Sequence, residues 1–209
     1  MTKRTPLRQT FPRVQRRLVE ASFDGGDITS DGGAVLLREA ERRVGLLRRV
    51  TRYIADPRRT ASCDHEFGAV LRQRVFGLAL GYEDLNDHES LRNDMALQTA
   101  VGRDVVLAHP STICRLEQKA QREWAWAAHR ALFEHFVASF DVPPDEVVLD
   151  FDATDDQVHG EQVGRYFHGH YNGYCFLPLY VFSGDHLLVA MLRPSSEGAA
   201  ARAQGVLAL

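Results

Sequence analysis

Two aspartates separated by one residue, Asp150 and Asp152, have the side chains and spacing of a metal-dependent site. They end an apolar stretch, residues 146–151, which is typical of a short buried strand. Because side chains alternate along a strand, both carboxylates should point the same way. Neighbouring carboxylates repel one another unless a cation compensates, and their hard oxygens suit Mg²⁺ or Mn²⁺. Two such ions can support phosphodiester cleavage by activating a water and stabilising the leaving oxygen.

The same run also has a purely structural interpretation. Asp152, Ala153 and Thr154 would form an Asx turn after the strand, and Asp155 and Asp156 would cap the next segment. Without its surroundings the run favours this interpretation, because Asp and Thr are common at strand ends.

The elements ahead of this strand are predicted to be helical, because apolar residues recur at three- and four-residue steps. The expected helices cover residues 34–55, residues 63–81, a stretch beginning near residue 87, and residues 111–140. Gly81 is the expected C-cap of the second helix and Ser111 the N-cap of the fourth. Pro57 ends the first helix and Pro143 the fourth.

After residue 144 the pattern changes to strands. Residues 174–182 and 186–192 are expected to pair through a tight turn at 183–185. Pro178 should mark an edge or a bulge, because it cannot donate to a ladder. Residues 197–209 resemble the opening of another helix. The prediction is an α+β fold: a helical N-terminal domain, then the first half of an α/β domain with three strands and the start of a helix.

Composition indicates a globular protein of 209 residues, with 44% hydrophobic and 9% aromatic residues. No apolar run approaches the roughly 18–20 residues that span a bilayer. The basic N-terminus lacks the apolar core of a signal peptide, so we expect a cytoplasmic protein without membrane contact. Three cysteines form no C-x-x-C pair, which favours reduced thiols over a disulfide or zinc framework.

Charge is distributed unevenly. Residues 1–59 hold 14 Lys and Arg against 7 Asp and Glu, a net of +7, whereas residues 60–209 hold 11 against 21, a net of -10. A basic arm ahead of an acidic body suits a phosphate backbone as partner. On charge alone, a solvated helix face with a frayed terminus is the favoured interpretation.

Residues that would contact DNA fall into three groups. An N-terminal arm and the first helix would contact phosphates, and a helix-turn-helix in which the fourth helix follows the third would contact bases. The residues are Arg13, Arg16 and Arg17 in the arm; Arg42, Arg43, Arg48 and Arg49 in the helix; and Thr112 and Arg115 at the helix-turn-helix. Simple helical packing is the alternative for the last pair.

Two other sets of residues have weaker claims to function. His168, His170 and Cys175 match no zinc pattern with a fourth ligand, so we expect ordinary loop histidines. Trp124 and Trp126 would stack on bases if exposed, but a helix rich in alanine more often buries such rings.

Several sequence blocks together resemble one known family. Residues 148–160, Val-Leu-Asp-Phe-Asp-Ala-Thr-Asp-Asp-Gln-Val-His-Gly, look like the first catalytic block of bacterial insertion-sequence DDE transposases, in the branch called DDE domain group 1. The likeness continues through residues 160–162, Tyr171, residues 174–182 and residues 192–194, with upstream agreement at 29–33 and 110–112. It spans roughly residues 20 to 209.

The resemblance implies an RNase H-like catalytic domain in which two aspartates and a glutamate bind two divalent ions, Mg²⁺ or Mn²⁺. The first aspartate corresponds to Asp152, with Asp150 as second choice. The second aspartate and the glutamate would follow the helix that begins near Glu197, and neither has a counterpart in these 209 residues. We therefore expect a truncated copy that does not cleave DNA on its own.

The expected division is a basic arm and turn segment at 1–33, a helical DNA-binding domain at 34–142, and a partial RNase H-like domain at 143–209. The expected partners are transposon-end and target DNA, and a second copy in a homodimeric synaptic complex.

Two alternatives remain from the sequence. A DNA-binding fragment without catalysis would occupy transposon ends and inhibit transposition. Residues 147–154 also fit the first motif of haloacid-dehalogenase-like phosphatases, with Asp150 as nucleophile and Asp152 as general acid/base. That family needs a later lysine, and the last lysine is Lys119, ahead of the strand.

Overall fold

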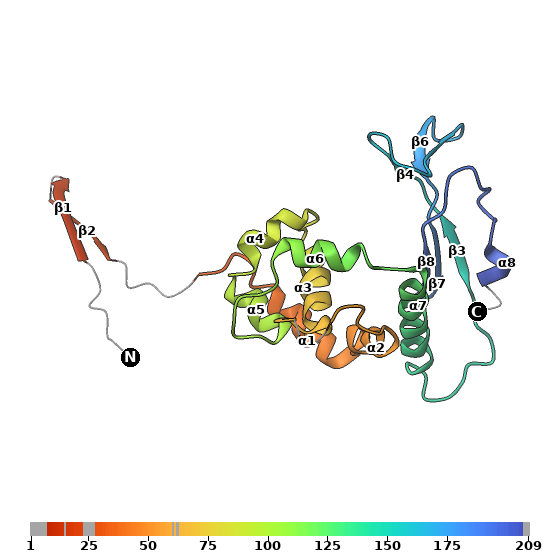
Figure 1. The fold of residues 1–209 in the computed structure, drawn as a ribbon, viewed down its shortest axis with the longest axis horizontal. Helices are drawn as coiled ribbons and strands as arrows, with labels where there is room; N and C mark the ends of the chain where they lie inside the picture. Colours follow the sequence, from red (N-terminus) through yellow and green to blue (C-terminus); the bar gives the residue numbers. More distant parts are fainter. Residues whose placement is uncertain (1–7, 15, 23–27, 60, 62, 207–209) are drawn as a thin grey trace.

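The computed structural model describes residues 8–14, 16–22, 28–59, 61 and 63–206. A two-stranded hairpin comes first, the helices follow, and two three-stranded antiparallel sheets come after them (Figure 1), which confirms the predicted α+β class. The described helices are α1 (Ala34–Val44), α2 (Leu46–Tyr53), α3 (Phe67–Ala79), α4 (His88–Leu91), α5 (Met95–Val101), α6 (Pro110–Glu117), α7 (Arg122–Val137) and α8 (Ala203–Val206), with a 3₁₀ turn η2 (Leu85–Asp87). The described strands are β1 (Arg8–Val14), β2 (Arg17–Ser22), β3 (Asp150–Ala153), β4 (Asp156–Gln157), β5 (Tyr166–His168), β6 (Gly173–Phe176), β7 (Leu179–Ser183) and β8 (His186–Met191).

The helix expected over residues 34–55 is divided at Gly45. This glycine adopts φ +66°, and its N–H ends α1 by donating to the carbonyl of Glu41. The Glu41 carboxylate then accepts the N–H groups of Leu47 and Arg48, each at 3.0 Å, and so caps the start of α2. Glycine adopts this left-handed backbone more readily than any residue with a side chain, which explains why the break falls here.

Helix α3 ends as expected. Gly81 adopts φ +94°, and the N–H of Tyr82 reaches back 2.9 Å to the carbonyl of Gly77. The stretch expected near residue 87 forms two short helices, because Asp94 begins a new one by accepting the N–H of Leu97 at 2.8 Å.

The single helix expected over residues 111–140 is wrong. It is two helices, α6 and α7, separated by residues 118–121, and Gln121 is extended. The cap of α6 is His109 rather than Ser111, because the His109 ring accepts the N–H of Ser111 at 3.1 Å. Residues 117–121 contain no large apolar side chain, so the spacing of apolar residues gave no sign that the helix breaks there.

The helical part contains two buried clusters, one around α1, α3 and α5 and one around α2, α3, α6 and α7. Gln73 lies fully buried on α3, and its amide donates to the Ala108 carbonyl and accepts the Ala108 N–H, both at 2.9 Å. This side chain therefore satisfies both backbone groups of a buried residue just ahead of α6.

The strands form a sheet in the order β3-β7-β8 and a smaller one in the order β4-β6-β5. The strand expected at 146–151 begins only at Asp150 and continues to Ala153. The strand expected at 174–182 is two strands in different sheets, and Pro178 lies in the link between them rather than at the expected edge or bulge, because a residue without an N–H fits outside a ladder. The turn expected at 183–185 joins β7 to β8, with Gly184 at φ +56°.

Helix α7 lies between the helical part and the β3-β7-β8 sheet. On one side, Tyr53 of α2 donates to the Glu134 carboxylate, and the Arg130 guanidinium lies 4.3 Å from the centre of the Tyr53 ring. On the other side, the His129 ring nitrogen Nε2 lies 2.9 Å from the Ala190 carbonyl oxygen at the edge of β8. Phe136 packs into the apolar cluster on the same sheet.

The residues expected to be an arm contain a hairpin. Strands β1 and β2 pair antiparallel, with Arg8 opposite Ser22 and Phe11 opposite Val19. In Figure 1 this hairpin lies apart from the helices. Among the described helices there is none with the length and apolar content that a bilayer crossing requires.

Candidate active site and DNA-contact residues

Strand β3 places Asp150 and Asp152 on one face, as expected. Both are exposed, while Phe151 and Ala153 between and after them are half-buried. Phe151 packs against the apolar cluster beneath the sheet, which fixes the strand's orientation. The carboxylates lie beside β7, where Asp150 pairs with Phe182 and Asp152 with Tyr180.

Neither carboxylate makes a hydrogen bond or ion pair with another residue of the described structure, so both pairs of oxygens face solvent. An Asx turn at Asp152 would require its side chain to accept a backbone N–H. Asp156 belongs to β4, paired with Phe176, rather than to a cap. The described residues thus show neither the Asx turn at Asp152 nor the cap at Asp156 that the structural alternative predicts.

The two carboxylates do not form a complete metal site within the described chain. Among those residues, no three His, Cys, Asp or Glu side chains gather closely enough to hold a metal ion. The sequence-predicted ligands are therefore brought together as a pair, and the described structure supplies no third.

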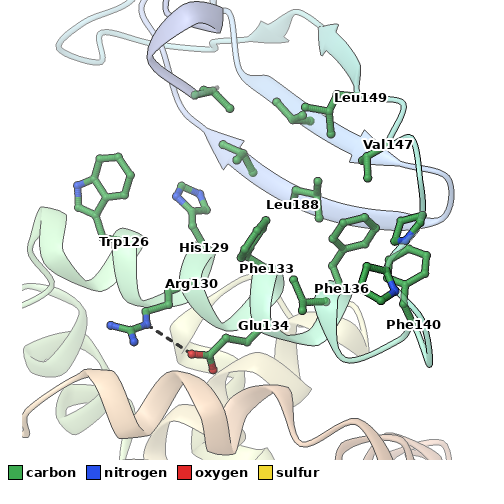
Figure 2. A pocket seen from close by; sticks show the side chains of 16 residues that line it. Trp126, His129, Arg130, Phe133, Glu134, Phe136, Phe140, Val147, Leu149 and Leu188 are labelled. Atoms are coloured by element: carbon green, nitrogen blue, oxygen red, sulfur yellow. Dashed lines mark hydrogen bonds and ion pairs between the residues drawn. The ribbon is translucent and has the colours of Figure 1, made fainter. Parts of the chain in front are cut away.

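A cavity of about 1050 Å³ lies on the other face of this sheet, between α7 and the strands (Figure 2). Its lining is mainly apolar and includes Phe133, Phe136, Leu149 and Leu188. Glu134, its one carboxylate, is hydrogen-bonded to Tyr53, which lowers the pKa of Glu134. The cavity therefore lacks the paired free carboxylates found on the opposite face.

The arginines predicted on the first helix are divided between two roles. Arg42 and Arg43 are exposed on α1, and both contact the Glu39 carboxylate, at 3.3 and 3.2 Å. Arg49 is half-buried and donates to the Val44 carbonyl at 2.6 Å, which satisfies the end of α1. Arg48 is exposed on α2.

The arm arginines lie in the hairpin. Arg16 is exposed in its turn. Arg13 is in β1 and Arg17 in β2, but their side chains lie outside the described part of the structure.

The predicted base-contacting pair lies on α6. Arg115 is exposed, and its guanidinium donates to the Ser111 carbonyl at 3.0 Å. Thr112 is half-buried. Residues 102–109 separate α5 from α6, a connection longer than the turn of a helix-turn-helix.

Burial and ring contacts decide between the interpretations of the two sets with weaker claims, the histidines with Cys175 and the two tryptophans. Cys175 is fully buried, and the rings of His168 and His170 lie 6.4 Å apart without forming a ligand cluster. His168 lies in β5 rather than in a loop. Trp124 packs edge-on against Phe67 at 5.3 Å, as the core interpretation predicted, whereas Trp126 is 39% exposed.

Arg193 is a structural residue that the sequence reasoning missed. It is fully buried after β8, and burial lowers the pKa of its guanidinium. Its Nε donates to the Leu177 carbonyl at 3.0 Å and its Nη1 to the carbonyls of Ala199 and Ala201. Its only sequence signal was its place in the block at 192–194.

The comparison with protein families gives the class. Residues 11–209 match the family described as Transposase DDE domain group 1. The chain therefore belongs to the DDE transposases, and specifically to their group 1. No curated protein and no solved structure matched. The phosphatase alternative finds no support in this result.

Proposed function

We propose that the chain serves DNA transposition and that Asp152 and Asp150 are its first ligands for Mg²⁺ or Mn²⁺. The observation that carries the proposal is the pair of exposed, unpaired carboxylates on one face of β3, within a DDE transposase domain. Asp152 is the preferred first member of the triad, because it lies in the Asp-x-Thr pattern with Thr154.

The residues present fit a hard divalent cation in their chemistry. Mg²⁺ and Mn²⁺ bind through one or two carboxylates and otherwise keep waters or take substrate phosphates, so exposed carboxylates suit them. When bound, such ions would supply the activated water and the charge stabilisation that phosphodiester cleavage requires. The remaining aspartate and glutamate of an RNase H-like triad are not among the described residues.

We propose that DNA is held mainly by α1 and α2. Between residues 34 and 53 there are six arginines and two glutamates. Glu41 is committed to the start of α2 and Glu39 to Arg42 and Arg43. The helix pair consequently presents positive charge to phosphates, with Arg48 exposed and without an ion-pair partner in the described structure. Arg13, Arg16, Arg17, Thr112 and Arg115 are proposed as further contacts.

The proposed division is a basic segment at 1–33, a DNA-binding helical domain at 34–142 and an RNase H-like domain at 143–209. Because α7 contacts both α2 and β8, it joins the second and third of these units. A homodimeric synaptic complex on transposon ends is the proposed assembly.

Binding of Mn²⁺, followed by the loss of its free-ion electron paramagnetic resonance signal, tests the metal proposal. Asp152→Asn and Asp150→Asn should each weaken binding about tenfold, because a ligand charge is removed. Asp185→Asn, an exposed aspartate in the β7–β8 turn, is the matched control and should bind as the unmodified chain does. Equal Mn²⁺ binding by the unmodified chain and all three variants would show that neither Asp150 nor Asp152 is a metal ligand.

A DNA-binding role without catalysis is the second candidate, favoured by the absence of a third carboxylate near Asp150 and Asp152 in the described structure. Gel-shift titrations with transposon-end duplex should show binding that falls steeply with salt, as counterion release requires. Mg²⁺-dependent nicking of the same duplex by the purified chain would decide for catalysis, and binding without nicking for the second candidate.

A further inference from the structure

We infer that the small β4-β6-β5 sheet is a stacking platform for unpaired DNA bases, formed by Phe167 and Tyr174. The inference rests on the proposed function, because it names the form of DNA that would lie beside the candidate carboxylates. It concerns a surface that neither the metal proposal nor the arginine proposal uses.

The two rings stand opposite each other on neighbouring strands. Phe167 of β5 pairs in register with Tyr174 of β6, so both side chains lie on the same face. Their ring centres are 5.6 Å apart with planes at 74°, yet Phe167 is 55% exposed and Tyr174 is 50% exposed. Large rings left this open on a described surface are available to a ligand.

A cation completes the platform. The Arg165 guanidinium lies 4.4 Å from the centre of the Tyr174 ring, as a planar cation over an aromatic face. Aromatic rings with an accompanying arginine are the groups that stack on successive bases of a single strand, since every base offers a π-face.

The platform is mounted rigidly. Cys175, next to Tyr174, is fully buried. The Ser195 hydroxyl donates to the Tyr166 carbonyl at 2.8 Å. Leu177 and Arg193 exchange hydrogen bonds, from the Leu177 N–H to the Arg193 carbonyl at 2.8 Å and from the Arg193 guanidinium to the Leu177 carbonyl at 3.0 Å. The segment after β8 is thus hydrogen-bonded to β5 and to Leu177, the residue that follows β6.

The platform is also attached directly to the candidate carboxylates. Two residues, Thr154 and Asp155, separate β3 from β4, and two, Leu177 and Pro178, separate β6 from β7. The sheet is therefore inserted between the strand that carries Asp152 and the strand that pairs with it. In Figure 1 it projects from the end of β3, β7 and β8. If a DNA strand lay at the carboxylates, its neighbouring nucleotides would lie close to this inserted sheet.

Charge favours bases over a duplex backbone as the occupant. Residues 154–178 contain Asp155, Asp156 and Glu161 against Arg165 alone, and Glu161 lies 3.8 Å from Arg165. A surface with this balance repels a duplex that must be held by its phosphates. Unstacked bases can instead gain from the rings directly, because every base has a face that stacks on an aromatic side chain.

A tryptophan reporter tests the inference in the full chain. Phe167→Trp should show fluorescence quenched by oligothymidylate but not by an abasic oligomer of the same length, after subtraction of the signal from the unmodified chain. Adding Tyr174→Ala should weaken this binding about tenfold. The matched control adds Tyr166→Ala instead. Tyr166 lies on β5 beside Phe167 but on the other face, so this change should leave the binding unchanged. Circular dichroism and thermal unfolding establish that each variant is folded.

Where quenching is observed, three outcomes would still overturn the platform. These are equal quenching by the abasic oligomer, an equal loss with Tyr166→Ala, or self-association of the chain that Tyr174→Ala abolishes, which would assign the surface to a second copy. If quenching is absent while Mn²⁺ binding still depends on Asp152, the platform alone fails. If Mn²⁺ and duplex binding are also absent, the proposed function fails with it.

Discussion

The helical part and the β3-β7-β8 sheet differ in how completely they are covered. The helices surround two buried clusters, and the buried amide of Gln73 is paired with the backbone of Ala108. The sheet buries only the face that meets α7, and that face retains a cavity of about 1050 Å³. Its other face carries Asp150 and Asp152, exposed and unpaired among the described residues.

This difference implies that side chains in the helical part mainly stabilise the fold, whereas those on the open face of the sheet are available for binding. Two carboxylates of the helical part serve its structure: Asp56 pairs with Arg58 at 2.8 Å, and Glu41 caps the start of α2. The carboxylates of Asp150 and Asp152 on β3 face solvent and contact no described residue. Substitutions in the two regions should therefore have opposite consequences for stability and for binding.

The largest expected effect is in the helical core. Leu97→Ala should lower the free energy of unfolding by about 3 kcal/mol, because Leu97 is completely buried and its removal leaves a cavity. Leu188→Ala should cost about 2 kcal/mol, since Leu188 already borders the cavity beside α7. Urea unfolding followed by circular dichroism measures both. A larger loss for Leu188→Ala would reverse the comparison.

Gln73→Ala should cost about 2 kcal/mol, because it leaves the N–H and the carbonyl of Ala108 buried without partners. Gln98→Ala is a matched control on α5, where the amide makes one bond to the Arg92 carbonyl at 3.1 Å. It should cost under about 1 kcal/mol. The same urea titration compares them, and equal losses would show that the two-bond clamp has no special role.

Acid should weaken the helical part through His88. Its ring is fully buried, its Nε2 lacks a partner in the described structure, and burial lowers its pKa from the ordinary value of 6.5. The unfolded chain then binds a proton more readily than the folded chain, so stability is full above that value and falls as the pH drops below it. Thermal unfolding at pH 7.5 and 5.5 should show a smaller shift for His88→Gln than for the unmodified chain. His65 and His135, whose pKa values burial also lowers, should leave part of the shift in place.

The smallest effect is expected on the open face of the sheet. Asp152→Asn should change the free energy of unfolding by less than about 0.5 kcal/mol, because it removes no contact with a described residue. Asp56→Asn should cost about 1.5 kcal/mol, because it weakens charged hydrogen bonds to Arg58. Calorimetry of the two variants decides this. A clear loss for Asp152→Asn would mean that this carboxylate holds the fold.

Periodicity and capping residues predicted the class of each region but not its internal breaks. Gly81 was placed correctly as a helix end, yet Gly45, with the same left-handed backbone, was not, because apolar residues continue across it. The apolar pattern has no means of showing that the Glu41 carboxylate caps the next helix. The break between α6 and α7 was missed for a similar reason, since Ala120 and Gln121 are compatible with a helix.

The carboxylate pair was predicted from alternation alone, and its shared face follows from the period of a strand. The stacking platform was not predicted, because β4 and β5 are too short to show a pattern and β6 was joined with β7 in one expected strand. Their existence depends on long-range pairing with residues after β8, such as the bridge between Phe176 and Pro194. Arg193 could not be identified as buried, since arginine is ordinarily a surface residue.

The position of α7 in the chain has a consequence for folding order. It is synthesised before every strand of the sheet that it supports, and the helices that hold its other side precede it. Contacts among those helices are short in sequence, which favours their rapid formation. Once α7 has been synthesised, the nascent chain therefore already exposes Phe136 and His129, the residues that will contact the sheet. The strands then condense onto an existing template rather than finding one another in solution.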